Sequence, residues 1–108
     1  MPTVNVFYKQ KKPDLNLFTN HIKSFLVNKL SNKDITLTPE EISVRFIQVE
    51  GDGMIAPVEI EITAHEFAER VKEQDEISSS LRDNLKKNYP QLGDIRVWLI
   101  LSQLGHSW

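Results

Sequence analysis

The stretch APVEIEI at residues 56–62 repeats the rhythm of PTVNVFY at residues 2–8. In both stretches a proline near the start is followed by apolar residues at every second position. This period of two predicts β-strands with one well-buried face, and in VEIEIT the glutamates occupy the other face. The two stretches therefore predict the first strands of two similar units.

A helical pattern follows each of these strands. In the first half, apolar residues recur at three- and four-residue spacing between Leu15 and Leu30, which predicts a helix with a single apolar stripe. In the second half, residues 66–88 predict a helix, and the pattern allows Phe67 and Val71 either to extend its apolar line or to lie in a lead-in loop. Each half is thus expected to continue as strand and helix.

A second strand is predicted at the end of each half. SVRFIQV at residues 43–49 and DIRVWLIL at residues 94–101 are rich in β-branched and aromatic residues. In both, an arginine directly follows a β-branched residue, so Arg96 matches Arg45 in a weak internal repeat. The second of these strands is strongly apolar, and we expect it to be central in its sheet.

The predicted fold class is α+β, with two tandem β-α-β units, residues 2–49 and 56–102, inside one domain spanning residues 1–108. A chain of 108 residues is long enough for one hydrophobic core. The units are expected to form a four-stranded mixed sheet with two helices on one face. Phe46, Trp98 and Ile100 are expected on the opposite face, where their apolar surface favours oligomerisation.

Composition narrows the function classes. The formal net charge is -2, which gives no general attraction to nucleic acid or to an anionic membrane. Cysteine is absent, which excludes thiolate chemistry, and the three histidines have no metal-ligand spacing, so neither a metal nor a cofactor is expected. Without a signal peptide or a long apolar run, a cytoplasmic protein that contacts no membrane is the expectation.

Three short motifs resemble the tautomerase superfamily, in particular sequences like 4-oxalocrotonate tautomerase. They are Pro2 at the start of the first strand, Lys12 with Asp14 before the first helix, and SVRF containing Arg45. The carboxyl-terminal DIRVWLILSQLGHSW is similar in placement to the last strand and tail of the macrophage migration inhibitory factor and malonate semialdehyde decarboxylase families. The resemblance implies a fused two-unit form, a homotrimer whose sheets line a central barrel, and active sites between subunits.

The resemblance also implies a chemistry based on Pro2. A free amino-terminal proline is a secondary amine that acts as a general base when it is neutral, so Met1 has to be removed. Nearby cations lower the pKa of such an amine and also bind carboxylate or enolate oxygens. Arg45 is expected to be the principal anion-binding residue, with Lys12 and Arg96 as additional cations.

The implied function is that of a cofactor-independent tautomerase acting on small unsaturated 2-oxo or 2-hydroxy carboxylic acids. Decarboxylation and hydrolytic dehalogenation use the same proline in the superfamily and remain open, as do roles for His106 and Trp108 in closing the site.

Two other readings compete with the enzyme. One is a non-catalytic oligomeric binding protein in which Met1 is retained, Pro2 only begins a strand, Lys12 is solvated, and Arg45 and Arg96 form ion pairs. The other is a ferredoxin-like regulatory domain, which also contains two β-α-β units.

Overall fold

The computed structural model describes residues 2–31 and 36–102, and it confirms the predicted α+β architecture. Short 3-10 helices, η1 (Pro39–Glu41) and η2 (Pro90–Leu92), precede the last strand of each unit. The main elements along the chain are β1 (Thr3–Tyr8), α1 (Leu15–Leu30), β2 (Ser43–Gln48), β3 (Val58–His65), α2 (Ala68–Lys72), α3 (Gln74–Asn88) and β4 (Ile95–Ser102).

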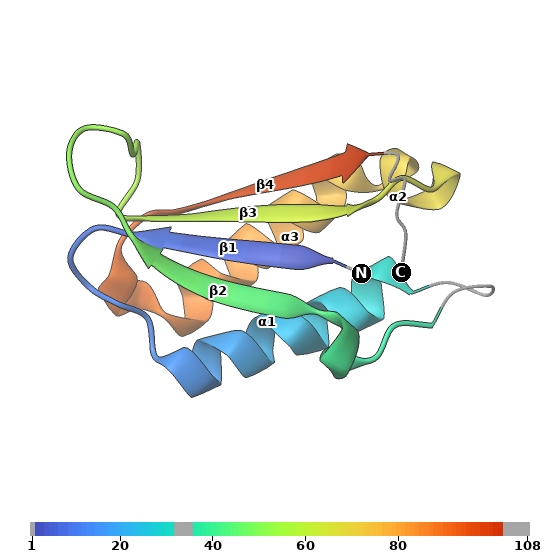
Figure 1. Ribbon diagram of the computed structural model, residues 1–108, viewed down its shortest axis with the longest axis horizontal. Coiled ribbons are helices and arrows are strands. Elements are labelled where there is room, and N and C mark those ends of the chain that lie inside the picture. Colours follow the sequence, from blue (N-terminus) through green and yellow to red (C-terminus); the bar gives the residue numbers. More distant parts are fainter. Residues whose placement is uncertain (1, 32–35, 103–108) are drawn as a thin grey trace, which may run out of the picture.

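The four strands form one mixed sheet in the order β2-β1-β3-β4 (Figure 1). β1 pairs with β2 and β3 pairs with β4 in parallel, whereas the inner strands β1 and β3 run antiparallel to each other. The prediction that the last strand is central is therefore wrong, because β4 lies at an edge. The strand is apolar throughout because both of its faces carry apolar side chains. Ile95 faces the core, whereas Trp98 and Ile100 are 43% and 44% exposed.

The strand registers relate the two units residue by residue. Val4 of β1 lies opposite Val44, and the corresponding Val58 of β3 lies opposite Ile95. The residues that follow Val44 and Ile95 are Arg45 and Arg96, so the structure gives these arginines equivalent places in the two units. Because β1 and β3 are antiparallel, however, the start of the first unit and the start of the second unit lie at opposite ends of the sheet.

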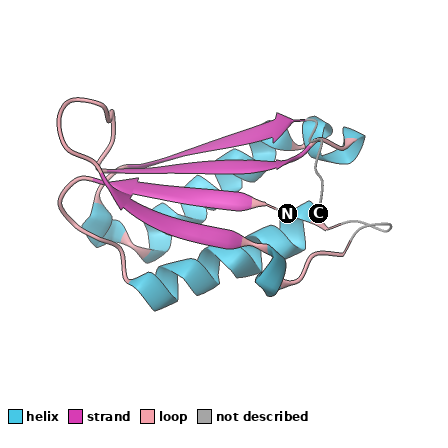
Figure 2. Cartoon of the chain, viewed as in Figure 1, coloured by secondary structure: helices cyan, strands magenta, loops and turns pink. Residues whose placement is uncertain are grey.

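Both long helices cover the same face of the sheet, as predicted (Figure 2). Apart from Leu15, which is 52% exposed, most of the predicted stripe of α1 is buried, and so is that of α3. Both stripes pack against alternate strand residues such as Val6 and Ile60. The helix residues of this core are Phe18, Ile22, Leu26 and Leu30 in α1 and Ile77, Leu81 and Leu85 in α3.

Phe46 lies on the helix side of the sheet, so its expected place on the opposite face is wrong. In the parallel register it lies beside Val6, whose side chain faces the core. Its ring packs 6.2 Å from that of Phe18, centroid to centroid. The sequence period placed Arg45 and Phe46 on different faces correctly, but it does not say which face receives the helices.

The helical region of the second unit is divided at Glu73 into α2 and α3. Phe67 precedes α2 and Val71 is 45% exposed, so neither residue extends the apolar line of α3. Phe67 instead contacts the His65 ring, at 4.7 Å between centroids. Among the described helices, none is long and apolar enough to cross a membrane.

Candidate functional site

Pro2 lies buried just before the inner strand β1. Its carbonyl oxygen accepts a hydrogen bond from the Ser43 amide, at 3.1 Å, which extends the pairing of β1 with β2. On the other side Thr3 lies opposite Thr63, so one further step of the same register brings Pro2 opposite Ala64. The end of α1 and the whole of α2 lie at this end of the sheet (Figure 1).

Arg70 of α2 is a buried cation at the same end of the molecule. Only 5% of its surface is exposed. Its Nη1 donates to the His65 carbonyl at 2.9 Å, while Nη2 and Nε donate to the Leu30 carbonyl at 3.1 and 3.4 Å. His65 directly follows Ala64, the residue opposite Pro2, so these bonds hold the guanidinium close to the start of β1.

The environment of Arg70 is electrostatically unbalanced. Burial lowers the pKa of Arg70 from its ordinary value, but a guanidinium remains protonated in proteins. Its contacts are two carbonyl oxygens and the Phe67 ring, whose centroid lies 4.8 Å from Cζ. No carboxylate within residues 2–31 and 36–102 forms an ion pair with it, so a positive charge with low solvent screening persists near Pro2.

Sequence reasoning missed Arg70 because an arginine in the polar run HEFAERVKEQDE is usually solvent-exposed. The antiparallel arrangement of the two units is what brings the segment after β3 to the start of β1. The internal repeat gave no signal for Arg70, because the corresponding residue of the first unit is Asn16.

Among the predicted cations, Arg45 lies nearest to Pro2 in the sheet. It is exposed on the open face of β2, two residues after Ser43, and it lies opposite Asn5 of β1. The Oδ1 atom of Asn5 is buried without a hydrogen-bond partner. Such an acceptor usually has a donor, so the polar row of Arg45, Asn5 and Glu61 on the open face is incomplete in a single chain.

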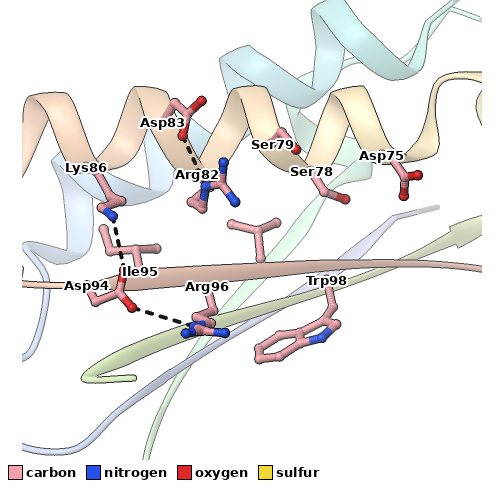
Figure 3. Close-up of a pocket in the computed structure, with 11 residues that line it drawn as sticks. Asp75, Ser78, Ser79, Arg82, Asp83, Lys86, Asp94, Ile95, Arg96 and Trp98 are labelled. Carbon is pink, nitrogen blue, oxygen red and sulfur yellow. Dashed lines mark hydrogen bonds and ion pairs between the residues drawn. The ribbon is translucent and has the colours of Figure 1, made fainter. Parts of the chain in front are cut away.

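Arg96 lies at the opposite edge of the sheet. It is three strand spacings, or about 14 Å, across the sheet from Arg45. Its Nε lies 3.5 Å from Oδ2 of Asp94, and Oδ1 of Asp94 lies 3.1 Å from Nζ of Lys86 (Figure 3). Arg96 therefore takes part in an ion-pair chain between β4 and α3.

Asp94 is the centre of that chain. The pKa of Asp94 is lowered, mainly by the hydrogen bond from Lys86 and further by the charges of Lys86 and Arg96. A cavity of about 530 Å³ lies beside it, between α3 and β4, with Arg82 on its helix side and Trp98 at its strand side (Figure 3). Because its lining residues come from α3 and from the start of β4, an outer strand, the cavity is separate from Pro2, which precedes the inner strand β1.

Lys12 is exposed in the connection between β1 and α1, beyond the end of β1 that is remote from Pro2. The six residues of β1 span about 20 Å. One chain therefore does not bring Lys12 or Arg96 to Pro2. Either residue can act there only if it comes from another copy of the chain.

No group of three or more metal-ligating side chains occurs in the part of the chain that the structure describes. The candidate tail residues His106 and Trp108 lie outside the described residues.

Comparison with solved structures supports the fold. No protein-family model matches the chain, and a search of curated proteins finds no match. MIF2 of Leishmania major aligns with 100% of this chain and 92% of its own, at 12% identity and a TM-score of 0.63. The macrophage migration inhibitory factor homologue of Prochlorococcus marinus aligns with 98% of this chain and 94% of its own, at 12% identity and a TM-score of 0.62.

A third similar structure comes from another branch of the superfamily. N1, a member of the cis-3-chloroacrylic acid dehalogenase family, aligns with 94% of this chain and 75% of its own, at 11% identity and a TM-score of 0.56. The chain therefore has the tautomerase fold, as its motifs suggested. At these identities the likeness shows the fold alone.

Proposed function

We propose that the chain is a cofactor-independent tautomerase that acts on small unsaturated 2-oxo or 2-hydroxy carboxylic acids, with Pro2 as the general base after removal of Met1. The observation that carries this proposal is the buried position of Pro2 next to the segment that holds Arg70. A fixed cation and low solvent exposure both disfavour protonation of an amine, so both keep Pro2 neutral near pH 7.

The proposed reaction moves one proton. The neutral Pro2 nitrogen takes the proton of the 2-hydroxyl group, the enol carbon-carbon double bond shifts to form the 2-oxo group, and the protonated amine returns a proton to carbon. An O–H bond breaks and a C–H bond forms, so no oxidant, metal or cofactor is needed. Cations that hold the substrate carboxylate and the developing oxyanion lower the barrier.

Arg45 is the proposed principal binder of the substrate carboxylate, since its planar guanidinium group can donate two parallel hydrogen bonds. Lys12 and Arg96 are proposed as additional cations supplied by a neighbouring copy, because neither reaches Pro2 within one chain. This requires an oligomer, proposed to be a homotrimer with sites between subunits. The exposed Trp98 and Ile100 on the open face supply apolar surface for that contact.

A non-catalytic oligomeric binding protein with the same fold is the second candidate. The observation that favours it is the separation of the four predicted site residues, of which only Arg45 lies near Pro2. If Met1 is retained, the Pro2 nitrogen is an amide and has no lone pair available for base catalysis. For either function we propose a cytoplasmic location, since a chain without cysteine suits a reducing compartment.

The test begins with the intact mass of the untagged protein purified from its native host. We expect the mass to lack methionine, and we expect this form to ketonise 2-hydroxymuconate and phenylenolpyruvate. Pro2→Ala should lower the rate by about 10² or more, since it replaces the positioned secondary amine. Retained Met1 in the native protein, or full activity of Pro2→Ala, would overturn the proposal.

A further inference from the structure

A second cleft lies at the end of the sheet remote from Pro2. It has a volume of about 480 Å³, within the usual range for small-molecule sites. The connection after β1, the loop before β3 and the turn before β4 meet around it, and the first two lie together at the left of Figure 1. Lys9, Lys11, Ile55, Pro57, Leu92 and Gly93 are among its lining residues.

The cleft occupies the place in the second unit that Pro2 occupies in the first. Val58 of β3 corresponds to Val4 of β1, so Ala56 corresponds to Pro2. The Ala56 nitrogen is a peptide amide, and it already donates to Oε2 of Glu59 at 3.0 Å. The second unit therefore has no terminal amine at the place that Pro2 occupies in the first unit.

Hydrogen bonds fix the walls of the cleft. Oε2 of Glu59 also accepts from the Ile55 amide at 2.7 Å, which orders the loop before β3. The Lys9 amide donates to the Pro57 carbonyl at 3.4 Å, and Nζ of Lys11 donates to the Gln91 carbonyl at 3.3 Å. Three chain segments are thus joined around the same space.

The lining combines positive charge with apolar surface. Lys9 and Lys11 form no ion pair with a carboxylate of the described residues, and an ammonium group has three donors, of which Lys11 uses one on Gln91. In the nearby Glu59 carboxylate, Oε2 accepts from two backbone amides. Ile55, which is 76% exposed, and Pro57 supply apolar surface to the lining of the same cleft.

We propose that this cleft binds a small carboxylic acid with an apolar body. The carboxylate would accept hydrogen bonds from Lys9 and Lys11, and the body would cover Ile55, Pro57 and Leu92. The cleft is lined by residues other than Pro2, Arg45, Lys12 and Arg96, and it lies at the other end of the sheet from Pro2 of the same chain.

The probe is phenylacetate, titrated into the full-length, isotope-labelled protein and followed by amide chemical shifts. We expect saturable shifts centred on Ile55, Ala56 and Gly93, with a dissociation constant of about 1 mM or lower. Phenylacetamide has the same body without the charge, and we expect it to bind at least about tenfold more weakly.

Variants separate the charge of this cleft from the general charge of the protein. The double variant Lys9→Ala with Lys11→Ala should lose the shifts at Ile55 and Gly93, whereas the control Lys23→Ala with Lys87→Ala removes the same charge from the helices and should retain them. Equal binding by all three proteins, tighter binding of the amide, or shifts confined to other regions would overturn the proposal.

One further variant keeps this result separate from the catalytic proposal. Pro2→Ala should bind phenylacetate at the cleft unchanged, as judged by the shifts of Ala56 and Gly93. Loss of those shifts in Pro2→Ala would place the ligand at Pro2 and overturn the assignment to the cleft, whether or not the protein is a tautomerase.

Discussion

At the start of β1, Pro2 is buried beside a segment anchored by the guanidinium of Arg70; at the equivalent start of β3, Ala56 is a peptide amide bonded to Glu59. The two units have the same order of strands and helix, but the nitrogen atoms at their starts differ in chemistry. Only the first has a nitrogen that peptide cleavage can convert to an amine. The comparison indicates that two units with the same fold can differ in chemistry. The position of each unit in the chain decides whether its first strand can begin with a free amine.

The largest expected effect concerns the outer strands of the two units. β4 exposes Trp98 on the open face, whereas the outer strand of the first unit exposes Ile47 there, at 37%. If assembly depends on the larger apolar surface of β4, Trp98→Lys should convert the oligomer to monomers at micromolar concentration, and Ile47→Lys should leave most of it assembled. Light scattering after size-exclusion chromatography measures the molar mass of both variants. Equal molar masses would show that the two outer strands do not differ in their contribution to assembly.

The second prediction compares the cations at the two ends of the sheet. Arg70→Met removes the fixed charge near Pro2, so the pKa of the Pro2 amine should rise and the rate at pH 7 should fall by up to about fivefold, because less of the amine is neutral. Lys12→Met should change the pKa of the Pro2 amine less, because Lys12 is exposed and reaches a Pro2 site only from a neighbouring copy.

The pH dependence of kcat/KM makes this prediction specific. In Arg70→Met the rising limb of the profile should move to higher pH, and Arg70→Lys should restore part of the shift by returning a cation. A uniform loss of rate at every pH would show that Arg70 acts only on the structure around Pro2.

The third prediction concerns Glu59, which orders the loop at the start of the second unit. Glu59→Gln weakens two charge-assisted hydrogen bonds from Ile55 and Ala56, so we expect a loss of about 1 to 2 kcal/mol in the free energy of unfolding. Glu61→Gln changes the same residue type on the same face of β3 and serves as the matched control in urea unfolding. An equal loss in both variants would mean that the backbone bonds of Glu59 add nothing.

The smallest expected effect is at Asp94, an exposed residue of the second unit whose counterpart, two residues before Arg45, is the neutral Ser43. Its pKa is lowered in the folded chain, mainly by Lys86, so its contribution to stability is present above the ordinary carboxyl pKa and is lost as the pH falls through the folded value. Asp94→Asn should therefore be slightly less stable than the parent at pH 7 and equal to it near pH 2. Thermal unfolding at the two pH values measures the difference.

Much of the fold was predictable from local patterns. The period of two in VEIEIT and the helical stripe of α1 each report which residues share a face, and both were confirmed. Strand order was not predictable in the same way, because an apolar strand such as β4 is compatible with an inner position and with an edge whose outer face is also apolar.

The candidate site was less predictable than the fold. Pro2 and Arg45 are candidates because they belong to short motifs, and Arg45 lies on the strand that pairs with the one that Pro2 precedes. Arg70 was missed because its burial results from contacts with the carbonyl of Leu30, which is distant in sequence, and with that of His65, the last residue of β3. Side chains buried by such tertiary contacts have no local pattern that reports them.

The edge position of β4 also has a consequence for handling the protein. Residues 95–101, IRVWLIL, combine high β-propensity with a single charge and contain neither proline nor glycine, which is the composition of segments that form intermolecular β-sheet. β4 pairs in parallel with β3 and can join the sheet only after α2 and α3 have been traversed, so it remains without a partner late in folding. Refolding should therefore succeed best at low protein concentration, and Arg96 is the residue in this strand that opposes aggregation.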